Sequence, residues 1–182
     1  MGILVAIALN AQNTHLKFKG IPIDGEYQTF AKQLVQKGFK QIESSPDGII
    51  LTGNFMATPE VMVVVYPDPT SKAVSAVTAF VEAGDNWSAI EGKYYDVVDI
   101  YTEKYGKPAE HVEAFTTAVH NNDILQKNAL QSGQCNYKSL WEAEGGHIVI
   151  SLLYFQYKYY VVCAYVDEQN GKALHQTIID DI

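Results

Sequence analysis

The chain has 182 residues and a formal net charge of −8, and its 13 basic residues other than histidine are all lysines. An acidic chain without arginine lacks the cationic clusters that bind nucleic acid, anionic membranes or phosphoryl groups, so we expect none of these partners. With 47% apolar and 19% charged residues, the composition is that of an ordinary globular domain.

The first residues predict export. Residues 3–9 form an uninterrupted apolar run that is too short to cross a bilayer as a helix, and small and polar residues follow it. This order is typical of a signal peptide with cleavage after Ala11. The alternative is a buried N-terminal strand, which the lack of a basic residue before the run favours. We expect a periplasmic or secreted protein, with a signal peptide remnant at 1–11 and one domain at 12–182.

The next segment predicts a helix followed by four strands. Residues 26–37 have apolar side chains at helical spacing, with Asp24 as the expected N-cap and Gly38 in the left-handed conformation after the last turn. Short turns rich in proline, aspartate and glycine then require antiparallel pairing. The expected strands are residues 40–45, 48–56, 60–67 and 73–83.

A longer helix opens the second half of the chain. Residues 87–105 carry seven large side chains at three- and four-residue spacing, enough to cover one face of a sheet. Asp85 or Asn86 is the expected N-cap, and the helix is expected to end at Gly106. Strands are expected at 134–142, 146–155 and 159–166, and then a last helix with Leu174, Ile178 and Ile179 facing inward. Residues 109–133 show no sustained period, and their first part fits a short helix or a strand.

Together these elements predict an α+β fold, with an antiparallel sheet of about seven strands and helices packed on one face. Segments 24–84 and 85–182 each begin with a helix that ends at glycine and continue with antiparallel hairpins. Two tandem helix-plus-meander repeats are one interpretation of this likeness. The other is coincidence, because a helix followed by antiparallel strands is a common arrangement.

Five short segments carry a resemblance to a known group of proteins. They read HLKFKGIPIDG (15–25), KGF (37–39), LTGNF (51–55), WSAIEG (87–92) and EKYGKP (103–108). Together they resemble uncharacterised secreted proteins of gut Bacteroidetes, over most of the chain except residues 116–133, which match loosely. The resemblance implies export and an α+β fold similar to the tandem helix-sheet repeat of the beta-lactamase inhibitory protein. It supplies no catalytic motif.

Cys135 and Cys163 are the only cysteines, and an exported chain could join them in a disulfide. In the meander expected above, however, Cys163 faces position 150, which in turn faces position 139. The two thiols are then one strand apart and offset, beyond the roughly 7 Å between Cα atoms that a disulfide tolerates. We therefore expect two free thiols.

Common catalytic motifs are absent from the chain, including nucleophile elbows, HExxH, CxxC and phosphate-binding loops. Donors of a zinc site occur in the irregular region, but a solvated acidic loop explains them without a metal. These donors are Glu110, His111, Glu113, His120 and Asp123. We expect no metal and no cofactor.

A thiol nucleophile with a base is a second arrangement that the sequence permits. Cys135 and His147, with Glu142 or Glu144, contain the residue types that such a site needs. They lie on either side of the turn at 143–146, so strand alternation does not require them to meet. We expect no catalytic residue among them.

Five aromatic residues occur among the seven residues 154–160, around an expected turn. Hairpin aromatics usually pair across strands and fill a core. Strand alternation, however, puts consecutive side chains on opposite faces, so these rings cannot all lie inside. Exposed aromatic residues are typical of binding surfaces. The predicted binding residues are Tyr154, Phe155, Tyr157, Lys158 and Tyr159.

The sequence therefore predicts an exported, non-catalytic domain that binds a protein rather than a small ligand. One alternative is a secreted hydrolase with a site assembled from scattered aspartate, glutamate and histidine. The other is a structural module that associates with itself. A deep pocket with two carboxylates or a Cys-His pair would favour the enzyme, whereas a shallow aromatic patch would favour binding.

Overall fold

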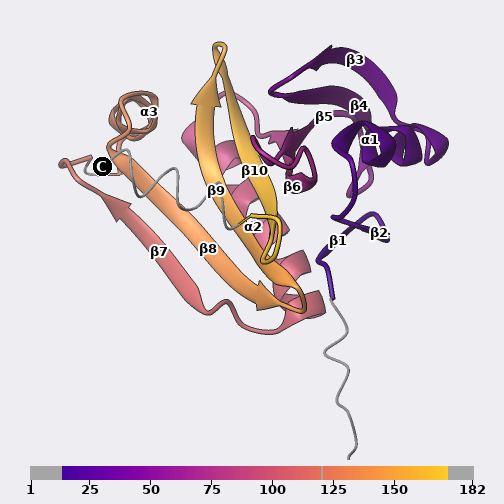
Figure 1. Ribbon diagram of the computed structural model, residues 1–182. Coiled ribbons are helices and arrows are strands. Elements are labelled where there is room, and N and C mark those ends of the chain that lie inside the picture. The colour runs from indigo at the N-terminus through magenta and orange to yellow at the C-terminus, as the bar shows by residue number, and fades with distance from the viewer. Residues whose placement is uncertain (1–13, 120, 172–182) are drawn as a thin grey trace, which may run out of the picture.

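The computed structural model describes residues 14–119 and 121–171. Within these residues lie three helices, an eight-stranded antiparallel sheet and a separate two-stranded hairpin (Figure 1). The helices are α1 (Tyr27–Gln36), α2 (Trp87–Tyr105) and α3 (Asp123–Gln131). The small hairpin consists of β1 (Lys17–Phe18) and β2 (Ile21–Pro22). The expected signal peptide remnant and the expected last helix lie outside the described residues.

The large sheet has the strand order β3-β4-β5-β6-β10-β9-β8-β7. Two meanders, β3 to β6 and β7 to β10, therefore join in the middle of the sheet through β6 and β10. The strands are β3 (Lys40–Ser45), β4 (Gly48–Phe55), β5 (Thr58–Pro67), β6 (Val74–Glu82), β7 (Glu110–Phe115), β8 (Cys135–Ala143), β9 (Gly146–Phe155) and β10 (Lys158–Asp167). The predicted α+β class is confirmed. Each meander follows a helix, but α3 interrupts the second one, and an internal duplication stays a prediction.

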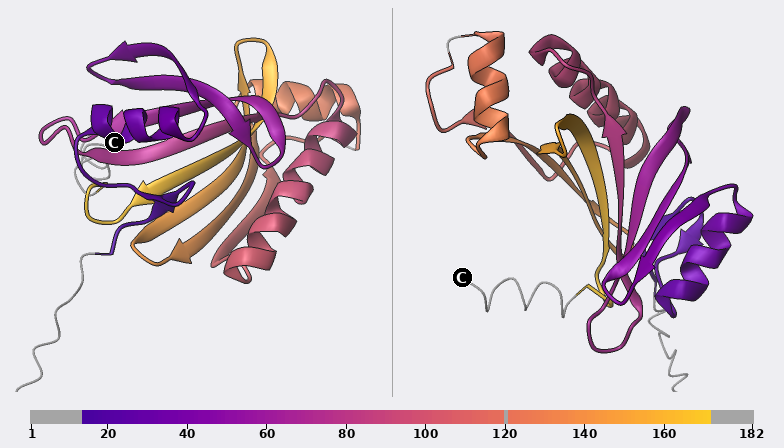
Figure 2. Two further views of the ribbon diagram at one scale, coloured as in Figure 1. Left: turned by 90° about the vertical axis from the view of Figure 1, so that its right-hand side faces the viewer. Right: turned by 90° about the horizontal axis from the view of Figure 1, so that it is seen from above.

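All three helices pack on one face of the sheet, as predicted. α1 contacts β3, β4 and β5, whereas α2 and α3 contact β8 and β9, and α2 also contacts β10 (Figure 2). The register places one row of residues across the sheet on this face: Leu51, Val63, Ala79, Cys163, Ile150 and Ser139. Side chains of all three helices join this row in one hydrophobic core, including Phe30, Tyr94 and Leu130.

The largest contribution to the core comes from α2. Six side chains of its predicted stripe are buried, and the seventh, Tyr105, packs against the core while partly exposed. Burial of a large apolar side chain stabilises the folded state by about 1.5 to 3 kcal/mol, so this one helix outweighs α1 and α3. The buried residues are Trp87, Ile90, Tyr94, Val97, Val98 and Tyr101.

The ends of α1 and α2 lie where the capping residues predict, except at the N-terminus of α1. The N-cap of α1 is Glu26, whose carboxylate accepts from the backbone N–H of Thr29 at 2.9 Å, and not Asp24. Two extra residues separate Asp24 from the first turn, so its side chain cannot reach these N–H groups. Gly38 has φ +94° after the last turn and α2 is capped by Asn86, both as predicted.

Residues 109–133 contain two elements that periodicity did not resolve. Strand β7 pairs with β8 at the sheet edge and makes the sheet eight strands wide rather than about seven. Its side chains are half-buried or exposed, so its pattern carries no clear alternation. Helix α3 follows an Asn122 cap and buries only three side chains, while Ile124 and Leu125 are exposed. A helix that covers so little leaves no apolar stripe in the sequence.

Both cysteines are free thiols, as predicted. Cys163 is paired in register with Ile150, which is paired with Ser139, so the thiols lie on different, offset strands. Burial raises the pKa of the Cys163 thiol to about 12, and that of the half-buried Cys135 thiol also to about 12. Neither thiol is therefore an activated nucleophile at neutral pH.

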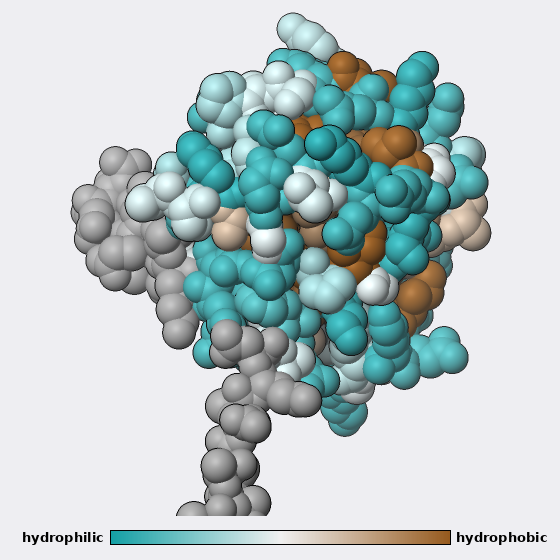
Figure 3. All heavy atoms as spheres, turned by 45° about the vertical axis from the view of Figure 1, so that its right-hand side comes forward, coloured by the Kyte–Doolittle hydropathy of each residue, from teal (hydrophilic) through white to brown (hydrophobic). Residues whose placement is uncertain are grey.

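The face of the molecule shown in Figure 3 is largely hydrophilic, and its hydrophobic residues lie in separate patches. Among the described helices none combines the length and apolar character needed to span a membrane.

Candidate functional site

The hairpin of β9 and β10 carries the five residues predicted to bind, and the structure divides them between two faces. Tyr154 and Tyr159 lie on the helix-covered face with their ring centroids 5.0 Å apart. Tyr159 is buried, and its hydroxyl accepts a hydrogen bond of 2.6 Å from the side-chain amide of Gln131 in α3. Both rings pack against the core, Tyr159 buried and Tyr154 half-buried.

Phe155, Tyr157 and Lys158 lie outside the core. Tyr157 is 92% exposed at the tip of the hairpin, and Phe155 is 44% exposed on the strand before it. Gln156 and Tyr157 form the turn with φ +48° and +64°, a left-handed conformation that asparagine and glycine adopt most readily. Tyr157 therefore gains no burial and adopts a conformation that is costly for a large side chain.

Lys158 begins β10 and pairs with Glu82 of β6, with 2.7 Å between Nζ and the carboxylate. The hydrogen bond to Glu82 raises the pKa of Lys158. Both side chains are exposed, so water screens the pair and it adds little to stability. The pair does hold the ammonium group beside the base of the hairpin tip.

The second face of the sheet carries no helix within the described residues. Its centre presents apolar and aromatic side chains from β5, β6, β9 and β10, and we call this surface the open sheet face. Its members are Met62, Val64, Tyr66, Phe80, Val149, Leu153, Phe155, Tyr160 and Val162. Four strands at about 4.8 Å spacing make it about 14 Å wide between the outer strands.

The open sheet face is continuous with the hairpin tip. Leu153 is paired in register with Tyr160, and the ring of Tyr160 meets the ring of Phe80 edge to face at 6.0 Å. Phe155 is the next residue of β9 on this face, and Tyr157 follows at the turn. Leu153 and Phe155 are both exposed. An apolar strip of this kind at the surface of a folded chain is typical of contact surfaces.

A polar cluster lies between α2 and the strands β7 and β8. Nδ1 of His111 is 2.8 Å from the hydroxyl of Ser139, and Nε2 of His111 is 3.1 Å from the carboxylate of Glu113. The hydroxyl of Tyr94 is also 2.8 Å from the Ser139 hydroxyl. Serine, histidine and carboxylate in this order are the components of a catalytic triad.

The geometry around Ser139 does not support catalysis by that triad. Ser139 is fully buried, and its hydroxyl lies between an imidazole and a phenol without access to a substrate. It also lies in the middle of β8, where β7 and β9 pair with it on both sides. Its surroundings therefore offer no free backbone N–H groups for an oxyanion. The cluster satisfies buried polar groups and joins α2 to the sheet edge.

The residues considered for a metal site are only partly brought together. His111 and Glu113 share one face of β7, but Glu110 lies on the other face and pairs with Lys138 at 2.8 Å. Asp123 instead accepts from the backbone N–H of Trp87, and this contact lowers its pKa. His120 lies outside the described residues, and those that are described contain no group of three or more metal-ligating side chains.

The predicted alternative of a thiol nucleophile is not supported by the positions of its residues. Cys135 begins β8 and is paired with Phe115 of β7, whereas His147 is the second residue of β9 and is paired with Glu142 near the other end of β8. Eight residues of strand separate Cys135 from the turn that carries Glu144. The thiol and the imidazole are therefore at opposite ends of the meander.

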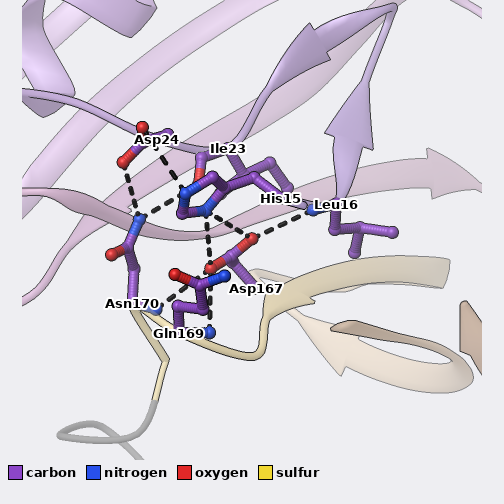
Figure 4. Close-up of polar contacts among 7 residues, drawn as sticks. All are labelled: His15, Leu16, Ile23, Asp24, Asp167, Gln169 and Asn170. Carbon is purple, nitrogen blue, oxygen red and sulfur yellow. Dashed lines mark hydrogen bonds and ion pairs between the residues drawn. The ribbon is translucent and has the colours of Figure 1, made fainter. Parts of the chain in front are cut away.

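His15 forms a second polar cluster, between the buried Asp167 and the exposed Asp24 (Figure 4). Its Nδ1 atom lies 3.1 Å from both carboxylate oxygens of Asp167, and its Nε2 atom lies 3.5 Å from Asp24. The pKa of Asp24 is lowered, chiefly because the backbone N–H of Gly25 donates to it. Asp167 is fully buried, and the backbone N–H of Leu16 donates to it at 3.0 Å.

The same cluster fastens the end of β10 to the segment that precedes β1. Backbone N–H groups of Gln169 and Asn170 donate to Asp167 at 3.0 Å, and the Asn170 amide donates to the carbonyl of Ile23. Figure 4 shows the backbone N–H groups of Gln169 and Asn170 meeting His15 at the carboxylate of Asp167. Because the buried Asp167 carboxylate is already held by His15 and by three backbone N–H groups, we assign the cluster a structural role.

Comparisons with protein-family models, with curated proteins and with solved structures found no match to this chain. The resemblance to secreted proteins of gut Bacteroidetes therefore stays a prediction.

Proposed function

We propose that this chain is an exported, non-catalytic domain that binds another protein through the hairpin tip and the open sheet face. The observation that carries the proposal is Tyr157, a large aromatic side chain that is 92% exposed in a left-handed turn conformation. Folding gains little from a tyrosine at this position. Tyrosine is, however, among the residues that contribute most to protein interfaces.

The shape and charge of the surface favour a protein partner that is not a second copy. A flat apolar strip that extends over four strands fits a macromolecular surface better than it fits a small ligand, which is usually bound in a concavity. Two copies of a chain with net charge −8 repel each other, whereas a basic or neutral partner is not repelled.

The apolar run at residues 3–9 supports export of the chain. The partner is then a protein of the periplasm, the cell surface or the surroundings. Fractionation of the native cells, with N-terminal sequencing of the recovered chain, tests this part of the proposal. A chain that is retained in the cytoplasm with residues 1–11 intact would contradict it.

The hydrolase alternative has less support among the described residues. The serine beside His111 and Glu113, Ser139, is fully buried, and the two thiols have raised pKa values. In the alternative of a self-associating module, two copies of the chain would contact each other through the same open sheet face. A measurement of the oligomeric state, described below, distinguishes this alternative from the proposal.

The decisive variant replaces the turn by the pair that its conformation favours. In Gln156→Asn with Tyr157→Gly, the asparagine-glycine turn should keep or raise the melting temperature, because both residues adopt positive φ readily. Residues 12–182 of the wild type and of the variant are used to capture proteins from the envelope and secreted fractions. The captured partner should bind the variant at least about 30-fold more weakly, as expected for a hot-spot residue worth about 2 kcal/mol.

A matched control is Ile42→Ala in β3, an edge strand that lies outside the proposed surface. Ile42 is 59% exposed, so its removal tests the loss of an exposed apolar side chain outside the proposed surface. This variant should bind the partner with wild-type affinity. Equal binding by the turn variant would refute the proposal, and so would a wild-type dimer that the turn variant loses, measured by light scattering after size-exclusion chromatography.

A further inference from the structure

A groove of about 530 Å³ lies on the helix-covered side of the molecule, at the opposite end of β9 and β10 from the hairpin tip. Its walls come from five places in the chain: residues 14–20, the end of β4 with the turn after it, the C-terminal part of α2, the end of β8 with the turn after it, and Tyr165 of β10. The volume is within the range of about 300 to 1,000 Å³ that is usual for small-molecule sites. The groove shares no residue with the surface proposed above.

The groove is lined by aromatic rings. Tyr101 and Tyr165 meet through their hydroxyl groups at 2.5 Å, and the ring of Tyr105 stacks on that of Tyr101 with centroids 5.9 Å apart. Burial raises the pKa of Tyr101 and of Tyr165, so both hydroxyls are neutral at physiological pH. Phe55 and Met56 contribute further apolar surface. This lining fits a flat or apolar body that carries no charge where it meets the rings.

The charges around the groove are mainly positive, although the chain as a whole is acidic. Lys17, Lys19 and Lys104 line it, and Glu144 is the one carboxylate residue among its lining residues. None of the three lysines is among the described lysines that form an ion pair, which are Lys127, Lys138 and Lys158. Unpaired ammonium groups around a partly enclosed apolar surface attract an anion more strongly than isolated surface lysines do.

Two of these lysines have contacts that orient them without neutralising them. Nζ of Lys104 lies 4.7 Å from the centroid of the Tyr105 ring, and Nζ of Lys19 donates to the carbonyl oxygen of Asn54 at 3.4 Å. A cation above a ring keeps its charge and can still pair with an anion. The ring of Tyr105 and the ammonium of Lys104 therefore present an apolar and a cationic surface side by side.

We propose that this groove binds a small amphipathic carboxylate, with its apolar or aromatic body against Tyr101 and Tyr105 and its carboxylate among the lysines. Lysine offers point charges rather than the planar fork with which arginine holds phosphate. The carboxylate of such a ligand would pair with the lysine ammonium groups, and its apolar part would contact the neutral tyrosine rings. Ligand binding is thus a second function, independent of the protein partner.

The test uses 2-naphthylacetate as the probe and 2-naphthylacetamide as its neutral counterpart, with residues 12–182 and isothermal titration calorimetry. The carboxylate should bind, the amide should bind at least about five-fold more weakly, and added salt should weaken only the carboxylate. Absence of carboxylate binding up to millimolar concentration would overturn the proposal. Equal affinity for both probes would overturn it too.

Matched lysine variants locate the site. Lys104→Met should lower the affinity for the carboxylate about three- to five-fold, since methionine keeps the apolar stem and removes the charge. Lys32→Met removes the same charge from the exposed side of α1 and should leave the affinity within two-fold. An equal loss in both variants would show a general charge effect and refute the groove as the site. The turn variant of Gln156 and Tyr157 should bind the probe like the wild type, which separates this test from that of the protein partner.

Discussion

Asp68 illustrates how one carboxylate shapes a connection between two strands. In the turn after β5, its Oδ1 atom accepts from the backbone N–H groups of Thr70 at 3.0 Å and Ser71 at 2.6 Å, and from the Ser71 hydroxyl at 2.9 Å. The N–H of Ser71 is the main reason that the pKa of Asp68 is lowered. These bonds favour the charged form in the folded state.

The lowered pKa makes this turn sensitive to acid. Because the folded pKa is below the unfolded one, the stabilisation is complete above the unfolded pKa near 3.8 and is lost as the pH falls through the folded pKa. Asp68→Asn should lower the free energy of unfolding at pH 7 by about 1 to 2 kcal/mol. In urea denaturation, the difference in the free energy of unfolding between the wild type and Asp68→Asn should be smaller at pH 3 than at pH 7. The exposed Asp47→Asn in the turn after β3 is the control, and a deficit for Asp68→Asn that is equal at both pH values would contradict the prediction.

Among the elements, α2 combines the largest buried surface with one residue that weakens it. Gly92 occupies an exposed position inside this helix, and a Cβ atom there would have no atom within 4 Å. Glycine loses more backbone freedom on folding than alanine does, at a cost of about 0.5 to 1 kcal/mol in a helix. The stability of α2 therefore comes from packing of its stripe and not from intrinsic propensity.

We predict that Gly92→Ala raises the free energy of unfolding by about 0.5 to 1 kcal/mol, measured by urea denaturation. Gly146→Ala is the contrasting variant, because a Cβ atom there would overlap the carbonyl oxygen of Val166 on β10. That backbone contact cannot relax without separating β9 from β10, so this variant should be strongly destabilised. Destabilisation by Gly92→Ala would show that the exposed side of α2 contacts something that the described residues do not include.

The whole molecule is held together by the pairing of β6 with β10. Seven register pairs join these strands in the middle of the sheet, and residues of both meanders belong to one hydrophobic core. Phe18 of the small hairpin adds to this continuity, because its ring contacts both Phe55 of the first meander and Tyr165 of the second. The two meanders therefore share one sheet and one core.

We therefore predict a single cooperative unfolding transition. Trp87 and Trp141 report on the second meander by fluorescence, whereas far-ultraviolet circular dichroism reports on the whole chain. The two probes should give coincident urea midpoints and slopes, as in a two-state domain. A fluorescence transition that precedes or follows the circular dichroism transition would indicate two units that unfold separately.

The elements themselves were largely predictable from the sequence. The helical stripe between Trp87 and Tyr105, the glycine after α1 and the proline- and glycine-containing turns are local signals, because each depends on backbone conformations and side-chain spacing within a few residues. Strand alternation also predicted that Tyr154 and Phe155 lie on opposite faces, and the expected turn predicted the exposure of Tyr157. The α+β class follows from the order of these elements.

Only the tertiary structure decided which distant residues meet. Strand β7 and helix α3 bury too little for a pattern, and no local signal places β10 beside β6. The cluster of Ser139 with His111 depends on the register between two strands that α3 separates in the chain. The groove is assembled from five separated parts of the chain. Such contacts are set by how strands and helices pack to bury one shared core, a global condition that local spacing does not contain.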